Sequence, residues 1–97
     1  MRDLFHIRIH DVVFSPANAR QRADGVEGFV ELSINGGVRV PGFRLRRTRA
    51  GEFKVDFPTK QDLSGRFHRT MEPLSPEARR SIELQILAAV REQGWIP

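Results

Sequence analysis

The chain has 97 residues, of which 39% are hydrophobic, and a net charge of +4. This length fits one domain, residues 1–97, and the apolar fraction is sufficient for a two-layer core. Cysteine is absent, which excludes disulfides, thiolate catalysis and cysteine-based metal sites and suits a cytoplasmic protein. The first residues contain no long apolar run, so we expect neither a signal peptide nor a membrane helix.

The positive charge is concentrated in the middle of the chain. Residues 1–38 and 72–97 each have a net charge of −1, whereas residues 39–71 hold nine cations and three acids, a net charge of +6. Arginine supplies 14 of the 16 cations, and its planar guanidinium suits phosphate and stacks on bases. This distribution favours a nucleic-acid partner, and the alternative is a soluble protein with charged loops.

The first expected strand is residues 4–11. Apolar and polar residues alternate there, which indicates a strand with one face in water. Residues 12–14 extend or close this strand. The polar residues 15–25 follow and end in Asp24-Gly25, a turn signal, so we expect an exposed loop or a wide hairpin connection.

Residues 29–34 and 38–46 are the second and third expected strands. Asn35-Gly36 between them predicts a type I′ hairpin turn, which needs positive φ at both central residues. The inward-facing residues of the second strand are Val30, Leu32 and Ile34. In the third strand the apolar residues occupy even positions before Pro41-Gly42 and odd positions after it. This change predicts a bulge or bend at Pro41-Gly42. After it, Arg44 and Arg46 point away from the core.

The fourth expected strand is residues 52–57, where apolar and charged residues alternate again. Pro58 ends it, because proline has no N–H to donate to a sheet. Residues 58–74 then read as a basic loop. Its basic side chains include Lys60, Arg66, His68 and Arg69.

A helix is expected from about residue 76 to 93. Ser75-Pro76-Glu77 combines a capping hydroxyl, a proline where no N–H is needed and an acid near the positive end of the helix dipole. Gly94 suits the C-terminal end, and Trp95 can fold back on the last turn. The main apolar face comprises Ile82, Ile86, Ala89 and Val90. The fold class is therefore α+β, an antiparallel sheet of four to five strands followed by one C-terminal helix.

A second stripe on this helix has two interpretations. It comprises Arg80, Leu84, Leu87 and Arg91, at spacings of four, three and four. It is either part of a wide buried face or a contact for a partner chain. We favour the partner chain slightly, because one helix covers only one face of a four-stranded sheet.

From Phe29 to Val90 the chain resembles the SpoVG family, the stage V sporulation protein G-like bacterial regulators. The matching segments are Val40-Pro41-Gly42-Phe43-Arg44-Leu45, Pro58-Thr59-Lys60, Gly65 with Phe67, and Pro73, Ser75-Pro76 and Arg79 at the helix entry. Gln61, Ser64 and Glu72 depart from the family pattern. The resemblance implies an antiparallel sheet with a C-terminal helix, a homodimer formed through strands, DNA binding, RNA binding in some members, and a role in transcription regulation.

The candidate nucleic-acid-binding residues are cations that can follow a phosphate track. They are Lys60, Arg79, Arg44, Arg66, Arg69, Arg80, Arg46 and Lys54. By the resemblance, Lys60 and Arg79 rank first and Arg44 third. The alternative for Arg79 is an ion pair with Glu83, worth about 0.3–0.5 kcal/mol, and Phe67 either stacks on a base or, as we favour, anchors the loop.

Catalysis has little support in the sequence. There is no glycine-rich phosphate loop, nucleophile elbow or HExxH motif. His6 and His10 share a strand face but are roughly 13 Å apart, too far for one metal ion. His68 is alone, and Asp56 and Asp62 have neither an acid partner nor a fixed geometry. We therefore expect no enzyme, cofactor, metal or small-molecule substrate.

Two function hypotheses follow. The first is a dimeric, cytoplasmic regulator that contacts DNA or RNA through the basic loop and the helix start. The second is a protein-interaction module that acts through an exposed strand edge or the Leu84/Leu87 stripe. The +6 middle third favours the first hypothesis.

Overall fold

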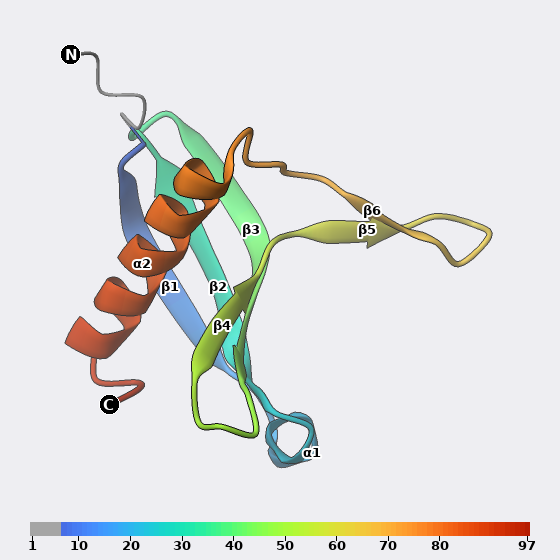
Figure 1. Cartoon of the computed structure of the whole chain (residues 1–97), viewed down its shortest axis with the longest axis vertical. Coiled ribbons are helices and arrows are strands. Elements are labelled where there is room, and N and C mark those ends of the chain that lie inside the picture. The colour runs from blue at the N-terminus through green and yellow to red at the C-terminus, as the bar shows by residue number, and fades with distance from the viewer. Residues whose placement is uncertain (1–6) are drawn as a thin grey trace.

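Four consecutive strands form one antiparallel sheet in sequence order, and a long helix crosses one of its faces (Figure 1). The computed structural model describes residues 7–97. Its elements are β1 (Ile9–Pro16), α1 (Ala19–Ala23), β2 (Val26–Ile34), β3 (Val38–Arg47), β4 (Phe53–Asp56), β5 (Thr59–Gln61), β6 (Phe67–Arg69) and α2 (Pro76–Glu92). Strands β5 and β6 form a separate two-stranded sheet. The expected α+β class, with an antiparallel sheet and a C-terminal helix, is confirmed. Neither helix in residues 7–97 is long and apolar enough to span a membrane.

The hydrophobic core lies between the sheet and α2. Alternate residues of the strands point to one face of the sheet, and residues three or four apart on α2 point back at them. The side chains with the least exposure are Val30, Leu32, Phe43, Leu45, Val55, Ile82, Ile86 and Val90. The predicted inward positions of Val30 and Leu32 and the main apolar face of the helix are thereby confirmed, whereas Ile34 and Ala89 are only half-buried.

The second stripe on α2 is divided between core and surface. Leu87 is buried in the core, whereas Leu84 is 48% exposed. The wide buried face is therefore the correct interpretation for Leu87, and of the two leucines Leu84 alone remains exposed for the predicted partner contact, which stays a prediction. Because the sheet is twisted, a helix across it buries more than a narrow stripe.

The predicted irregularity in β3 is a bulge. Val30 of β2 lies opposite Phe43 of β3, and Leu32 lies opposite Val40. The two residues of β2 are two positions apart, whereas their partners are three positions apart, so β3 contains one extra residue. The extra length is taken up at Pro41-Gly42, where Gly42 has a φ of 96°. This bulge allows Phe43 and Leu45 to enter the core although the residues before it have the opposite parity.

Polar side chains of α2 cover both edges of the sheet. The Glu83 carboxylate accepts a hydrogen bond from the N–H of Val55 on β4, at 3.3 Å. At the other edge, the Gln85 side chain accepts from the N–H of Ile9 at 3.0 Å and donates to the carbonyl of Ile7 at 2.9 Å. The helix thus binds backbone groups that a neighbouring strand would otherwise pair with.

The beginning of the chain differs from the prediction. β1 starts at Ile9 and runs to Pro16, and the predicted start at residue 4 falls outside the described residues. Of the two alternatives expected for residues 15–25, the wide hairpin connection is correct, because the segment joins the antiparallel pair β1 and β2, but it contains the short helix α1, which was not predicted. That helix is stabilised by a capping box, in which the side chains of Asn18 and Gln21 each accept from the other's backbone N–H.

The segment expected as a basic loop, residues 58–74, is the larger correction. Its first part forms the β5–β6 hairpin, which projects away from the sheet and helix (Figure 1). We refer to residues 59–69 as the arm. Pro58 ends β4 as predicted, but its carbonyl accepts from the N–H of Thr70 at 3.1 Å and closes the base of the arm. The strands of the arm are three residues long and lack apolar alternation, so no pattern marked them.

The two ends of α2 follow the prediction. The Ser75 hydroxyl accepts from the N–H of Ala78 at 3.1 Å, which satisfies a free donor of the first turn. Gly94 has a φ of 84° and ends the helix. The N–H of Trp95 then donates to the carbonyl of Val90, and the indole ring lies 5.1 Å from the ring of Phe14.

Candidate nucleic-acid interface

A cleft of ≈ 640 Å³ lies between the arm and the body of the protein. It receives Arg44 from β3, Arg69 from β6 and Arg79 from the first turn of α2. Asp56 is the one acid among the residues that line it, so three arginines and one aspartate give the lining a net charge of +2. Three of the eight predicted cations, distant in sequence, are therefore brought together.

Asp56 holds the arginines of β3 in place. Its carboxylate oxygen accepts from Arg44 Nη2 at 2.8 Å and from Arg46 Nε at 2.6 Å. Burial opposes ionisation of Asp56, but the hydrogen bonds and charges of the two guanidinium groups outweigh it and lower its pKa. The hydrogen bond to Asp56 raises the pKa of Arg46. Two cations share one anion, so the cluster keeps a positive charge, and Asp56 has a fixed geometry, contrary to the prediction.

Arg79 is positioned by an aromatic ring. Its guanidinium carbon lies 4.9 Å from the centre of the Phe57 ring, a cation–π contact. The alternative ion pair with Glu83 is not present in the described structure; Glu83 instead pairs with Arg80 at 3.2 Å. Arg79 is thus held over the Phe57 ring and exposed at the cleft, whereas Arg80 pairs with Glu83 on the same helix.

The two faces of the arm carry different cations. Thr59 lies opposite Arg69, Lys60 opposite His68, and Gln61 opposite Phe67. Because side chains alternate along a strand, Phe67 and Arg69 project from one face and Lys60 from the other. Phe67 and Arg69 line the cleft, while Lys60 lies beside His68 in a separate shallow hollow. Of the two residues ranked first from the sequence, Arg79 lines the arginine cleft and Lys60 lies outside it.

Asp62 organises the turn of the arm. One of its oxygens accepts from the N–H of Ser64, the hydroxyl of Ser64 and the N–H of Arg66, and the other lies 2.6 Å from Nε2 of His68. The hydrogen bond from His68, followed by that from Ser64, lowers the pKa of Asp62 to about 2. The prediction that Asp62 lacks a fixed geometry is wrong.

The other predicted cations do not line the cleft; they are Arg46, Lys54, Lys60, Arg66 and Arg80. Arg46 and Lys54 are directly opposite each other on the face of the sheet that α2 does not cover. Like charges in this position destabilise a sheet slightly, and the ion pair of Arg46 with Asp56 offsets this repulsion. Arg66 lies in the turn of the arm, and Arg69 makes a long contact of 3.4 Å with the exposed Glu72.

Two exposed aromatic residues of the cleft were not among the predicted site residues. Phe29 is 38% exposed and Phe67 is 68% exposed, and both line the cleft. We expected Phe67 to anchor a loop, but its exposure shows that it does not. The sequence did contain a signal for Phe29. In residues 29–34 the core residues Val30 and Leu32 occupy alternate positions, and Phe29 has the opposite parity, which places it on the other face of the strand. A large aromatic residue with outward parity indicates a contact surface.

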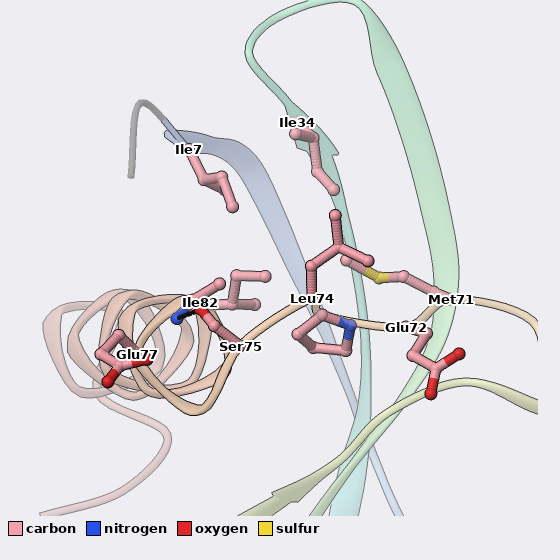
Figure 2. Close-up of a pocket in the computed structure, with 10 residues that line it drawn as sticks. Ile7, Ile34, Met71, Glu72, Leu74, Ser75, Glu77 and Ile82 are labelled. Atoms are coloured by element: carbon pink, nitrogen blue, oxygen red, sulfur yellow. Dashed lines mark hydrogen bonds between the residues drawn. The ribbon is translucent and has the colours of Figure 1, made fainter. Parts of the chain in front are cut away.

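A second groove has a different character. It has a volume of ≈ 530 Å³ and lies between the start of α2 and the sheet. Figure 2 shows the side chains of Ile7, Ile34 and Ile82 pointing into it, with Leu74 at its centre and 97% exposed. The acids beside it, Glu72 and Glu77, repel phosphate. This groove suits apolar groups and not a nucleic-acid backbone.

Comparison with known proteins adds no identification. No family model matches the chain, and no curated protein matches it either. The resemblance to the SpoVG family therefore stays a prediction, based on the segments quoted above.

Proposed function

We propose that this protein is a nucleic-acid-binding regulatory protein that acts without enzymatic activity. The observation that carries the proposal is the convergence of Arg44, Arg69 and Arg79 on one cleft. Guanidinium groups bind phosphate through paired donors, and several at one site track a phosphate chain. Arg46 and Lys54 extend the positive charge over the uncovered face of the sheet.

The arrangement of the acids supports the same proposal. Near the cleft, Asp56 is shared by Arg44 and Arg46, and Glu72 makes only a long contact with Arg69. Surface ion pairs of this kind contribute about 0–1 kcal/mol, so a phosphate group can compete for the arginines at little cost. The ion pairs keep the side chains extended and ready for a ligand.

The test is fluorescence anisotropy of labelled duplex DNA and single-stranded RNA across a salt series. The variant is Arg69→Glu/Arg79→Glu, which reverses two charges in the cleft. We expect wild type to bind with a steep salt dependence. The variant should bind weakly, and loss of two phosphate contacts should reduce the slope of log K against log salt by about 1.8 for duplex DNA.

The matched control is Arg20→Glu/Arg22→Glu on α1, which makes the same change in net charge at exposed positions away from the cleft. Binding by this control close to that of wild type assigns the effect to the cleft. A third variant, Lys60→Glu, reports on the opposite face of the arm. Absence of binding to both ligands at low salt by wild type would sink the proposal.

A dimeric state belongs to the same proposal, since the resemblance to the SpoVG family implies a homodimer. Two copies would present two clefts and so bind one longer strand or two half-sites. Light scattering coupled to gel filtration measures the mass directly. A mass of 11.1 kDa at all accessible concentrations would contradict it.

A protein-interaction module is the second candidate, and the apolar groove of Figure 2 favours it. Leu74 is almost fully exposed beside this groove, which is costly in water unless a partner covers it. Docking through strand edges is disfavoured, because Glu83 and Gln85 already bind edge groups. A Leu74→Ser variant that loses a partner but retains nucleic-acid binding would separate the two functions.

A further inference from the structure

The aromatic residues of the arginine cleft carry an inference about which form of nucleic acid enters it. Phe29 and Phe67 are both exposed there, although a phenylalanine ring has no group with which to bind phosphate. Phe29 belongs to β2 and Phe67 to β6, which lie in different sheets, and both side chains line this cleft. The cleft therefore offers apolar ring surface as well as charge.

Aromatic and cationic side chains alternate around this cleft. Phe29 lies directly opposite Arg44 on neighbouring strands, and Phe67 precedes Arg69 by two residues on the same face of the arm. Arg79, whose guanidinium carbon lies 4.9 Å from the centre of the Phe57 ring, adds a third guanidinium group. A nucleic-acid strand also has a flat base and a charged phosphate in each nucleotide. One aromatic ring and one neighbouring cation can therefore bind the base and the phosphate of one nucleotide.

Base accessibility separates single strands from duplexes. In a duplex the faces of the bases are stacked on one another, and only their edges are presented in the grooves. Phenylalanine cannot read an edge by hydrogen bonding, but it can stack on the face of an unpaired base. A volume of ≈ 640 Å³ also lies within the range of about 300–1,000 Å³ that is typical of small-ligand pockets, which suits a single base and its sugar.

We infer that the cleft binds single-stranded nucleic acid, with an unpaired base stacked against Phe67 or Phe29 and its phosphates on Arg44, Arg69 and Arg79. This inference rests on the proposed function and goes beyond it, because it specifies the strand type. The same stacking chemistry is available from RNA and from single-stranded DNA. Stacking depends little on base identity, so the cleft discriminates between strand states more than between sequences.

The test compares three labelled probes of about 12 nucleotides, a length within the site sizes of single-strand binders. They are oligo(U), oligo(dT) and a DNA duplex of mixed sequence. The variants are Phe67→Leu and Phe29→Leu, which keep apolar volume and remove the ring. Trp95→Leu is the control, since it removes a half-exposed ring at the far end of α2. Thermal unfolding confirms that each variant is folded.

We expect wild type to bind the single strands more tightly than the duplex. Phe67→Leu should weaken single-strand binding at least about fivefold, the low end of the loss on removing one base stack. Its salt slope should stay unchanged, because no phosphate contact is lost. The Trp95 control should bind as wild type. A preference for oligo(U) over oligo(dT), or the reverse, identifies which strand chemistry is recognised.

The outcomes distinguish the two proposals. If none of the three probes binds, the nucleic-acid function itself fails. If the duplex binds as tightly as the single strands, and both phenylalanine variants bind as wild type while Arg69→Glu/Arg79→Glu does not, then the proposed function stands. The inference of a single-stranded ligand is then overturned.

Discussion

The body and the arm of this protein are ordered in different ways. In the body, side chains from β2, β3, β4 and α2 are almost completely buried against each other. In the arm, every residue from 59 to 70 is exposed, and its order comes from strand pairing and from hydrogen bonds to Asp62. An isolated two-stranded hairpin is marginally stable in water. The difference teaches that the body supplies stability, whereas the arm holds exposed side chains in a defined position.

The largest expected effect separates two phenylalanines. Phe43 is completely buried and makes an edge-to-face contact with Phe57 at 5.3 Å, whereas Phe67 is 68% exposed. We expect Phe43→Ala to lower the free energy of unfolding by about 3–5 kcal/mol. Phe67→Ala should change it by less than about 0.5 kcal/mol. Urea denaturation followed by circular dichroism measures both, and similar losses for both variants would break the contrast between body and arm.

A smaller effect is expected at the edge of the body. Glu83→Ala removes the acceptor of the Val55 N–H and leaves that backbone group without its partner. The expected loss is about 1–3 kcal/mol, the cost of a buried donor left unpaired. Leu84→Ala on the same helix, at a half-exposed position, is the control. Equal stability of Glu83→Ala and wild type would show that the helix does not stabilise this edge.

The helix start should matter less again. Ser75→Ala removes the hydroxyl that accepts from Ala78 and should cost about 0.5–2 kcal/mol. Ser75→Asp restores an acceptor at the same position and should recover most of the loss. Thermal melts of the three proteins test this, and a Ser75→Asp variant no more stable than Ser75→Ala would contradict the capping role.

The smallest effect on the whole molecule is expected in the arm. The pKa of Asp62 is lowered from 3.8 to about 2. The hydrogen bonds that its carboxylate accepts therefore contribute fully to the stability of the turn above about pH 4. That contribution is lost as the pH falls through about 2, because protonation removes the acceptor. NMR chemical shifts of the Ser64 and Arg66 amides should follow this titration, while those of core residues such as Leu45 do so less.

Asp62→Asn is the control for this titration, because its amide does not ionise. Its Ser64 and Arg66 amides should show no transition between pH 4 and 2, the range bounded by the two pKa values. A wild-type midpoint near 3.8 would mean that His68 and the turn do not stabilise the carboxylate. The order of the arm would then not depend on the ionised carboxylate of Asp62, and the explanation given for the arm would fail while that for the body stands.

The sequence predicted the body well and the arm poorly, for physical reasons. Alternation in β2 and β4, the cap at Ser75 and the bulge at Pro41-Gly42 are local signals that burial enforces. The arm has three-residue strands without apolar residues to bury, so it produced no periodic signal. Sequence composition identified the basic region, but the cleft depends on contacts between distant elements. Lys60 and Arg79 ranked first, but only Arg79 lines the cleft, because strand register decides on which face of the arm Lys60 lies and register cannot be read from charge.

The bulge in β3 has a consequence for how the chain tolerates changes in length. Deleting Gly42 would place Val40 and Phe43 two positions apart, the same separation as that of their partners Leu32 and Val30, so that one alternation would run through the whole strand. Phe43 and Leu45 would keep their buried positions. A deletion at Gly36 or Gly37, where an added side chain meets nothing, alters only a turn. We therefore expect both deletion variants to be expressed in soluble form, and an insoluble Gly42 deletion would show that the fold needs the extra residue of the bulge.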